Sequence, residues 1–352
     1  MTEQRGYRLH RWGVDPVWES FDRRSPMEGE VLVQVEACGI GSTVLNLIRR
    51  DPEDPTVALP RVPGHELVGR VVEAPSRADR QWIGRRVTAY FYLFCGHCRT
   101  CVAGQENRCV NLAGLIGLHI DGGYAPYVVL PSRNLIDVPK GLDPVAATVV
   151  ADAVATPVHI ARTRARIGFV DRVAIIGAGG GVGIHLVQVA RLHGAAVAGL
   201  DVTDDKLAAI SDLGAEPVRS TDLETLDGRF WPDGGPTVIV DFVGTTQTIA
   251  WAQRSIERGG RVTVMTSFPD VDARLDPMRL VEWEASLIGS RYASRREVQI
   301  AAELVAAGRI RPMIGAIVPP DGVLDVHRRL RSGGIVGRAA VDYLATSPGA
   351  TG

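Results

Sequence analysis

Four of the five cysteines lie close together and could bind one metal ion. They are Cys95, Cys98, Cys101 and Cys109, spaced C-x2-C-x2-C-x7-C. Four thiolates complete a tetrahedral zinc shell, which leaves no open coordination position for a substrate. Bacterial ferredoxins also begin C-x2-C-x2-C, but their fourth cysteine follows after three residues and precedes a proline. The spacing therefore favours a structural zinc ion over an iron–sulfur cluster or four unligated thiols.

A glycine-rich turn, Gly177-Ala-Gly-Gly-Gly-Val-Gly183, joins a predicted strand to a predicted helix. Residues 172–176 have the pattern of a short buried strand, and residues 184–193 carry apolar side chains at helical spacing. A second strand is predicted at 196–200. Strand, glycine turn, helix and strand in this order are typical of dinucleotide-binding proteins.

The glycines of this turn follow the spacing G-x-x-G-x-x-G rather than the strict G-x-G-x-x-G. We expect the first to make the tight turn, the next to let the backbone approach a pyrophosphate, and the last to let the helix pack on the strand. The positive end of the helix would then face the phosphates. The predicted cofactor-binding residues of the turn are Gly177, Gly180, Gly181, Val182 and Gly183.

An acidic residue, Asp201, ends the second predicted strand, near the expected distance of ~20 residues from the turn. A carboxylate there accepts hydrogen bonds from the ribose hydroxyls and repels a 2′-phosphate, so it predicts NAD(H) over NADP(H). The alternative is an ordinary loop acid before the next helix.

Further elements continue the same pattern. Strands are predicted at 237–243 and 261–266, with a helix at 246–256 between them. Together with the first strands they predict an α/β fold with a doubly wound parallel sheet.

Composition limits the remaining possibilities. The chain has 352 residues, which suggests about two domains. Its net charge of −1 predicts no nucleic-acid partner. The most apolar stretch, 145–160, is interrupted by Asp152, Pro157 and His159, so no membrane span is predicted. The N-terminus has no apolar core of a secretory signal, which predicts a cytoplasmic location.

Motifs in both halves carry a resemblance. The segment Val62-Pro-Gly-His65-Glu66, the cysteine lobe at 95–109, Asp121-Gly-Gly-Tyr-Ala125 and Gly334-Ile-Val-Gly-Arg338 occur in this order around the glycine turn. The chain resembles the zinc-containing alcohol dehydrogenases of the medium-chain dehydrogenase/reductase superfamily. The resemblance implies a GroES-like, β-rich catalytic domain at 1–153 and 291–352, and a Rossmann NAD-binding domain at 154–290, with a cleft between them.

The resemblance also implies site residues. His65, Glu66 and Asp152 match positions that surround the catalytic zinc, and Thr43 matches a hydroxyl of the proton relay. Three further residues match positions near the cofactor. These are Thr156 beside the nicotinamide, Lys206 at the adenosine ribose, and Val243.

The catalytic centre departs from the family pattern at its first ligand. Where the family has a cysteine, this chain has Gly41, and Val44 replaces an aspartate that supports the metal shell. A catalytic metal could therefore rely only on His65, Glu66 and Asp152. Cys38, three positions before Gly41, is interpreted as a small apolar filler.

Three functions remain open. The first is NAD(H)-dependent hydride transfer between an alcohol and an aldehyde or ketone, with a metal ion polarising the oxygen. The second is a reductase without catalytic zinc, acting on an activated C=C or C=N bond. The third is a cofactor-binding protein without turnover, as a sensor or structural protein. A small-molecule substrate is expected, and the resemblance implies a homodimer or homotetramer.

Overall fold

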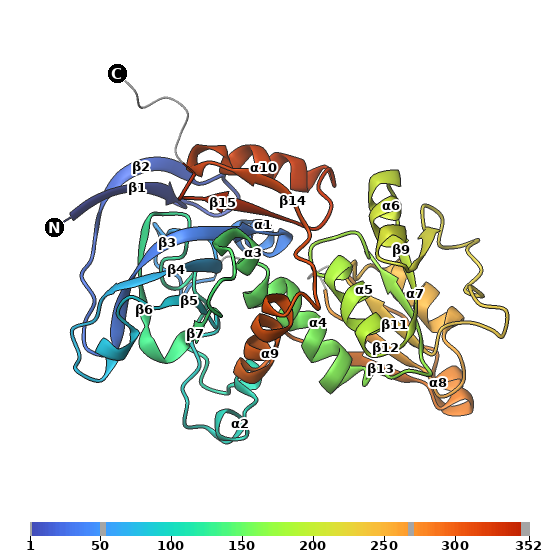
Figure 1. The fold of residues 1–352 in the computed structure, drawn as a ribbon. Helices are drawn as coiled ribbons and strands as arrows, with labels where there is room; N and C mark the ends of the chain where they lie inside the picture. The colour runs from blue at the N-terminus through green and yellow to red at the C-terminus, as the bar shows by residue number, and fades with distance from the viewer. Residues whose placement is uncertain (1, 50–53, 267–270, 346–352) are drawn as a thin grey trace. The chain divides into compact units, whose positions relative to one another are not determined.

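The computed structural model describes residues 2–49, 54–266 and 271–345. The chain divides into two compact units. Unit 1 contains residues 1–152, 293–308 and 314–352, and unit 2 contains residues 153–292 and 309–313. Figure 1 shows the helices and strands of each unit, coloured along the chain from blue at the N-terminus to red at the C-terminus. The functional domain limits implied by the resemblance stay a prediction.

Unit 1 is built on β-strands. Seven form one sheet in the order β14-β15-β3-β4-β5-β7, with β6 also paired to β3, and β1 pairs with β2. The strands are β1 (Thr2–Arg8), β2 (Val17–Arg23), β3 (Glu30–Ile40), β4 (Glu66–Glu73), β5 (Arg86–Ala89), β6 (Tyr127–Pro131), β7 (Leu135–Asp137), β14 (Ile314–Val318) and β15 (Arg338–Asp342). Its helices are α1 (Ser42–Ile48), α2 (Arg99–Val102), α3 (Pro144–Ala147), α9 (Arg295–Ala306) and α10 (Val323–Arg331).

Strand β3 is the centre of the unit 1 sheet, because it pairs with β4, β6 and β15. Nearly all of its side chains are buried. The antiparallel register with β15 places Ala339 opposite Ile40 and Ala340 opposite Gly39. The last strand of the fold therefore begins beside the residue that follows β3.

Unit 2 contains a six-stranded parallel sheet in the order β10-β9-β8-β11-β12-β13. The strands are β8 (Arg172–Ile176), β9 (Ala196–Asp201), β10 (Glu216–Arg219), β11 (Val238–Asp241), β12 (Arg261–Val264) and β13 (Ser286–Gly289). Its helices are α4 (Ala155–His159), α5 (Gly183–Leu192), α6 (Asp204–Asp212), α7 (Thr246–Ser255) and α8 (Pro277–Trp283). The predicted doubly wound sheet is confirmed, since the order reverses between β8 and β11.

Strand β11 is shorter than the prediction of 237–243. Asp241 ends it, because Oδ1 of its carboxylate accepts hydrogen bonds from the backbone N–H groups of Val243 and Gly244 at 2.8 and 3.0 Å. These bonds turn the chain away from the sheet before α7. The hydrophobic pattern alone does not reveal such a turn.

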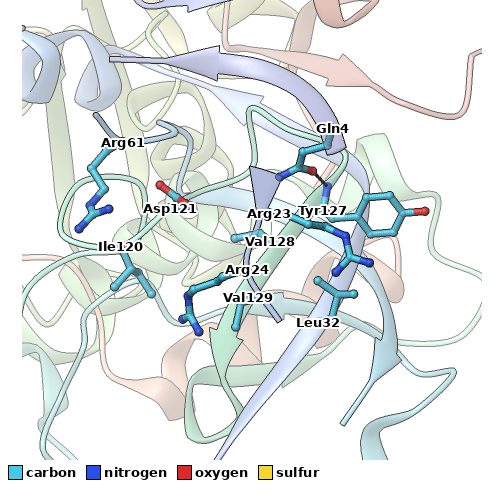
Figure 2. A pocket seen from close by; sticks show the side chains of 10 residues that line it. All are labelled: Gln4, Arg23, Arg24, Leu32, Arg61, Ile120, Asp121, Tyr127, Val128 and Val129. Carbon is cyan, nitrogen blue, oxygen red and sulfur yellow. Dashed lines mark hydrogen bonds between the residues drawn. The ribbon is translucent and has the colours of Figure 1, made fainter. Parts of the chain in front are cut away.

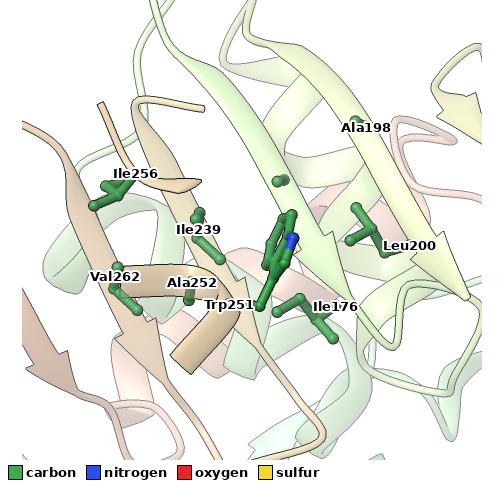
Figure 3. Close-up of a cluster of buried hydrophobic side chains, with 9 residues drawn as sticks. Ile176, Ala198, Leu200, Ile239, Trp251, Ala252, Ile256 and Val262 are labelled. Atoms are coloured by element: carbon green, nitrogen blue, oxygen red, sulfur yellow. The ribbon is translucent and has the colours of Figure 1, made fainter. Parts of the chain in front are cut away.

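A cluster of apolar side chains fills the space between the unit 2 strands and α7 (Figure 3). Trp251 on α7 is fully buried in it, and its indole N–H donates to the carbonyl of Leu226 at 3.1 Å. The cluster consists of Ala174, Ile176, Ala198, Leu200, Ile239, Trp251, Ala252, Ile256 and Val262. Packing of this kind holds the strand ends, and the turns that follow them, in fixed positions.

One helical stretch, residues 144–164, is long and apolar enough to cross a membrane by length and composition. It is interrupted by π-helical turns at Val150–Val154 and Ile160–Arg164. Its most apolar window is 89% buried inside the protein, as expected for a core helix. The stretch therefore passes the test of length and hydropathy in spite of its polar interruptions, and the absence of a membrane span stays a prediction.

Candidate active site and metal centres

The four cysteine sulfurs of the lobe converge on one point. Sγ of Cys95 lies 3.6 Å from Sγ of Cys109 and 3.9 Å from Sγ of Cys101, and Cys98 lies 3.9 Å from Cys109. A tetrahedron with Zn–S bonds of ~2.3 Å has edges of ~3.8 Å. The sulfurs are thus already spaced as the corners of a zinc shell.

Local hydrogen bonds prepare some of these thiols for a cation. The hydroxyl of Thr100 lies 3.2 Å from Sγ of Cys98 and lowers the pKa of that thiol to about 5. A hydrogen bond from the backbone N–H of His97 lowers the pKa of Cys95, whereas burial raises the pKa of Cys101 to about 12. A bound zinc ion would stabilise all four thiolates, because thiolates are its preferred ligands.

The lobe is attached to α9 through one acidic residue. Oε2 of Glu106 accepts a hydrogen bond from the backbone N–H of Arg295 at 3.2 Å. The Arg295 side chain donates to the carbonyl of Leu135 at 3.1 Å and lies over the ring of Phe94 at 5.6 Å. Metal binding in the lobe therefore acts on a segment that is fixed to the body of unit 1.

The glycine turn after β8 requires glycine at particular positions. Gly177 has a φ of +77°, which favours glycine. A Cβ at Gly183 would lie 2.3 Å from the carbonyl oxygen of Gly177, so the start of α5 approaches the turn closely. Gly180, Gly181 and Val182 are half-buried between them. The geometry is that of a loop whose backbone can face a pyrophosphate.

Asp201 lies at the end of β9, directly beside this turn. Its Oδ2 accepts a hydrogen bond from the backbone N–H of Gly179, and its Oδ1 accepts one from Val202, both at 2.8 Å. Nζ of Lys206 lies 3.5 Å from Oδ1. A Cβ at Gly179 would lie 2.4 Å from Cβ of Lys206, a close approach that the sequence analysis did not anticipate.

The other predicted cofactor residues lie in the same unit. Val243 follows β11, and its Cγ2 lies 3.2 Å from the place where a Cβ on Gly177 would be. Thr156 is buried on α4, which packs against α5. The structure thus gathers the turn, Asp201, Lys206 and Val243 at the carboxyl ends of β8, β9 and β11.

A second group of possible metal ligands lies in unit 1. One ligand atom each from His65, Glu66 and Asp152 falls within 4.8 Å of the others, and all three side chains are buried. Glu66 is the first residue of β4, His65 directly precedes it, and Asp152 lies on the π-helical turn at 150–154. The His65 ring contacts the Phe91 ring, with centroids 4.5 Å apart.

This second group already contains a cation. Nη2 of Arg338 lies 2.9 Å from Oδ2 of Asp152 and 3.1 Å from Oε1 of Glu66. Nε2 of His65 lies 3.5 Å from the same Asp152 oxygen. Burial lowers the pKa of Arg338, but Glu66 and Asp152 raise it by more, so the guanidinium remains charged. Two of the three donors, Glu66 and Asp152, are already paired with a buried guanidinium, and this arrangement does not fit a catalytic zinc ion.

Arg338 is the site residue that sequence reasoning missed. It stands in the motif Gly334–Arg338, which served only to indicate a closing strand. The available signal was Gly41, because a glycine leaves space where the resemblance implies a metal ligand close to Glu66 and Asp152.

The remaining predicted residues occupy the same region. Thr43 is half-buried on α1, two positions after Gly41. Cys38 is fully buried within β3, and burial raises the pKa of its thiol well above the usual range. An inert, protonated thiol agrees with the interpretation of Cys38 as an apolar filler.

A pocket elsewhere in unit 1 is separate from these centres (Figure 2). It has a volume of about 130 Å³ and lies beside β1 and β6, where Gln4 accepts a hydrogen bond from the backbone of Tyr127 at 3.1 Å. It is lined by Gln4, Arg23, Arg24, Leu32, Arg61, Ile120, Asp121, Tyr127, Val128 and Val129. None of the predicted site residues lines it.

Comparison with known families gives two matches along the chain. Residues 27–140 match the family "Alcohol dehydrogenase GroES-like domain", and residues 181–307 match "Zinc-binding dehydrogenase". An alcohol dehydrogenase of Geobacillus stearothermophilus is 33% identical over 325 residues, which cover 91% of this chain and 93% of that protein.

Solved structures share the fold over almost the full length. A thermostable alcohol dehydrogenase from Pyrobaculum aerophilum, solved with cobalt and zinc, has a TM-score of 0.85 and 27% identity, covering 97% of this chain and 100% of its own. A protein from Sinorhizobium meliloti 1021 described as a zinc-binding dehydrogenase, solved with NADP, has a TM-score of 0.85 and 30% identity with the same coverage. The GroES-like and Rossmann fold prediction is thereby confirmed.

Proposed function

Since the chain belongs to the zinc-type alcohol dehydrogenases of the medium-chain dehydrogenase/reductase superfamily and is an enzyme of that type, we propose that it transfers hydride between NAD(H) and an alcohol/carbonyl pair. The observation that carries this proposal is the glycine turn held by Asp201 at the switch point of the parallel sheet. A small molecule is the proposed substrate, and a cytoplasmic homodimer or homotetramer is the proposed form.

The residues of unit 2 would bind and orient the cofactor, which supplies the hydride carrier when it is bound. The backbone of residues 177–183 would face the pyrophosphate, and Asp201 would accept hydrogen bonds from the ribose hydroxyls. Both Asp201 oxygens keep a lone pair besides the bonds to Gly179 and Val202. Its negative charge supports NAD(H), although Lys206 at 3.5 Å offsets part of that charge.

The residues of unit 1 would handle the proton. We assign Thr43 as the hydroxyl that donates a hydrogen bond to the reacting oxygen, and His65 as the group that exchanges its proton. General acid–base groups of this kind contribute ~100-fold or more to the rate. Thr43→Val should therefore lower kcat by ~100-fold while NADH binding stays unchanged.

A second candidate is reduction of an activated C=C or C=N bond. It is favoured by Arg338, whose guanidinium lies among the carboxylates that would otherwise support a metal ion. Without Lewis-acid polarisation, an unactivated carbonyl is harder to reduce. A bond that is already conjugated or cationic needs less electrophilic activation to accept hydride.

One assay separates the candidates. NADH consumption is followed with simple aldehydes and ketones, with α,β-unsaturated carbonyls and with cyclic iminium compounds, in the wild type and in Thr43→Val. Turnover of simple carbonyls supports the first candidate, and turnover of activated bonds alone supports the second. Tight NADH binding without any turnover would contradict both and indicate a protein that only binds the cofactor.

A further inference from the structure

The position of the missing metal ligand is occupied from the opposite strand. Gly41 is the N-cap of α1, with φ −133° and ψ 176°. This extended conformation is open to every residue type, so the backbone does not require glycine. The requirement comes from a neighbour, because a Cβ at Gly41 would lie 1.8 Å from Nη1 and 2.5 Å from Cζ of Arg338.

The register of the sheet explains why Arg338 reaches this place. Arg338 is the first residue of β15, and the next residue, Ala339, lies opposite Ile40 on β3. The arginine side chain consequently enters the space that a side chain at Gly41 would fill. Only 3% of Arg338 is exposed, so its guanidinium cannot move aside into solvent.

The ion pairs hold the guanidinium there. The same Nη2 atom serves Asp152 at 2.9 Å and Glu66 at 3.1 Å. Two buried carboxylates need a countercharge, since an unpaired buried charge is strongly destabilising. In this chain the permanently charged guanidinium of Arg338 supplies that countercharge.

A divalent ion cannot share this space with the guanidinium. Zinc binds carboxylate oxygens and imidazole nitrogens at ~2 Å, so an ion held by His65, Glu66 and Asp152 would lie among the same carboxylates that now pair with Arg338. It would then lie beside a fixed positive charge in a buried environment, where repulsion between like charges is strong. Metal and guanidinium therefore exclude each other.

We propose that the guanidinium of Arg338 replaces the catalytic metal ion, so that Glu66 and Asp152 are held by a built-in cation and zinc binds only at the four-cysteine lobe. The absence of a side chain at Gly41 is the condition that admits this cation. The proposal concerns the same site as the proposed function and rests on it only for the location of the reaction.

Zinc content is the first test, because it does not depend on turnover. Zinc per chain is measured by elemental analysis after purification without added metal, and again after dialysis against excess zinc. We expect about one zinc in the wild type under both conditions, and about two in the double variant Gly41→Cys/Arg338→Ala, which restores a thiolate and removes the guanidinium. About two in the wild type, with one lost in His65→Ala, would overturn the proposal.

A stability cycle is the second test and remains informative if the double variant fails to take up zinc. Gly41→Ala adds a single methyl group and should lower the Tm clearly in the wild type. In an Arg338→Ala background the same substitution should have little further effect, since the clash is gone. Gly289→Ala, where a Cβ meets no atom of the described residues within 4 Å, is the matched control.

Equal Tm losses from Gly41→Ala in both backgrounds would show that the two positions are independent and would refute the replacement. If hydride transfer is absent but the zinc count and the coupling are as expected, the proposed function fails while this inference stands.

Discussion

The backbone N–H of Gly179 donates a hydrogen bond of 2.8 Å to Oδ2 of Asp201, so the acid at the end of β9 also holds the glycine turn that follows β8. Its other oxygen accepts from Val202 at 2.8 Å. Asp201 is proposed to bind the ribose, and it therefore also stabilises the phosphate-binding loop. Substitutions at this position affect cofactor affinity through both roles.

Asp201→Asn should weaken NADH binding and shift the preference towards NADPH. The substitution preserves shape and one acceptor oxygen, but removes the charge that repels a 2′-phosphate. Hydrogen bonds to charged groups contribute ~1.5–3 kcal/mol, so the Kd for NADH should rise ~10- to 100-fold. Fluorescence titration with both cofactors measures this change. Asp212→Asn, an exposed carboxylate on α6, is the control, and an unchanged NADH/NADPH ratio in Asp201→Asn would contradict the assignment.

Two glycines of the turn should respond differently to alanine. At Gly183 the added Cβ would lie 2.3 Å from the Gly177 carbonyl oxygen, whereas at Gly180 it would lie 3.3 Å from the same atom. Overpacking against backbone typically costs ~1–3 kcal/mol. Gly183→Ala should therefore lose stability in urea denaturation and lose NADH binding, while Gly180→Ala should remain close to the wild type in stability. A larger loss of stability in Gly180→Ala than in Gly183→Ala would contradict the observed close contact between Gly183 and the Gly177 carbonyl.

Cys98→Ser should reduce zinc from about one to about zero per chain, because three thiolates hold the ion much more weakly than four. The loss should be accompanied by faster proteolysis within 95–109, since α2 and the cysteine loop have little apolar core of their own. Cys38→Ala is the control and should keep the zinc. Retention of zinc in Cys98→Ser would place the ion elsewhere.

His327 on α10 should make the protein sensitive to mild acid. Burial, with Arg331 nearby and in spite of Asp15, lowers the pKa of His327 to about 4. Below a pH of ~6.5 the His327 imidazole binds a proton in the unfolded chain but stays neutral in the folded chain. The free energy of unfolding therefore falls as the pH drops from ~6.5 to ~4, and it levels off below that. The contribution between pH 7 and pH 5 is ~2 kcal/mol.

The matched variant for this effect is His327→Gln, which can still hydrogen-bond the Tyr124 hydroxyl, 3.3 Å from Nε2 of His327. Urea denaturation at pH 7 and pH 5 compares the two proteins. The wild type should lose more stability than the variant over this interval. Parallel losses would show that His327 does not carry the pH dependence.

Local patterns in the sequence were sufficient for the cofactor unit. Strand β8 was predicted at its observed limits, because five consecutive residues before a glycine turn are enough to mark a buried parallel strand. Strand β11 was predicted too long, since the turn made by Asp241 depends on side-chain hydrogen bonds that periodicity does not encode. The cysteine spacing predicted the convergence of four sulfurs for a similar local reason.

The second centre could be predicted only in part. The resemblance brought His65, Glu66 and Asp152 together and marked Gly41 as a missing ligand, but it did not indicate what takes the place of that ligand. The contact between Gly41 and Arg338 depends on strand pairing between distant parts of the chain, and on the direction of one long side chain. The local sequence pattern predicts neither the strand pairing nor the direction of the side chain.

The two clusters also differ in how far along the chain their partners lie. Cys95 and Cys109 are separated by 14 residues, whereas Asp152 and Arg338 are separated by 186. The entropic cost of closing a loop grows with its length. The cysteine cluster therefore forms readily, whereas the pair of Asp152 and Arg338 forms only after the strands of the unit 1 sheet have paired. We expect a folding chain to bind zinc well before β15 docks on β3, and Glu66 and Asp152 to remain without their countercharge until that late step.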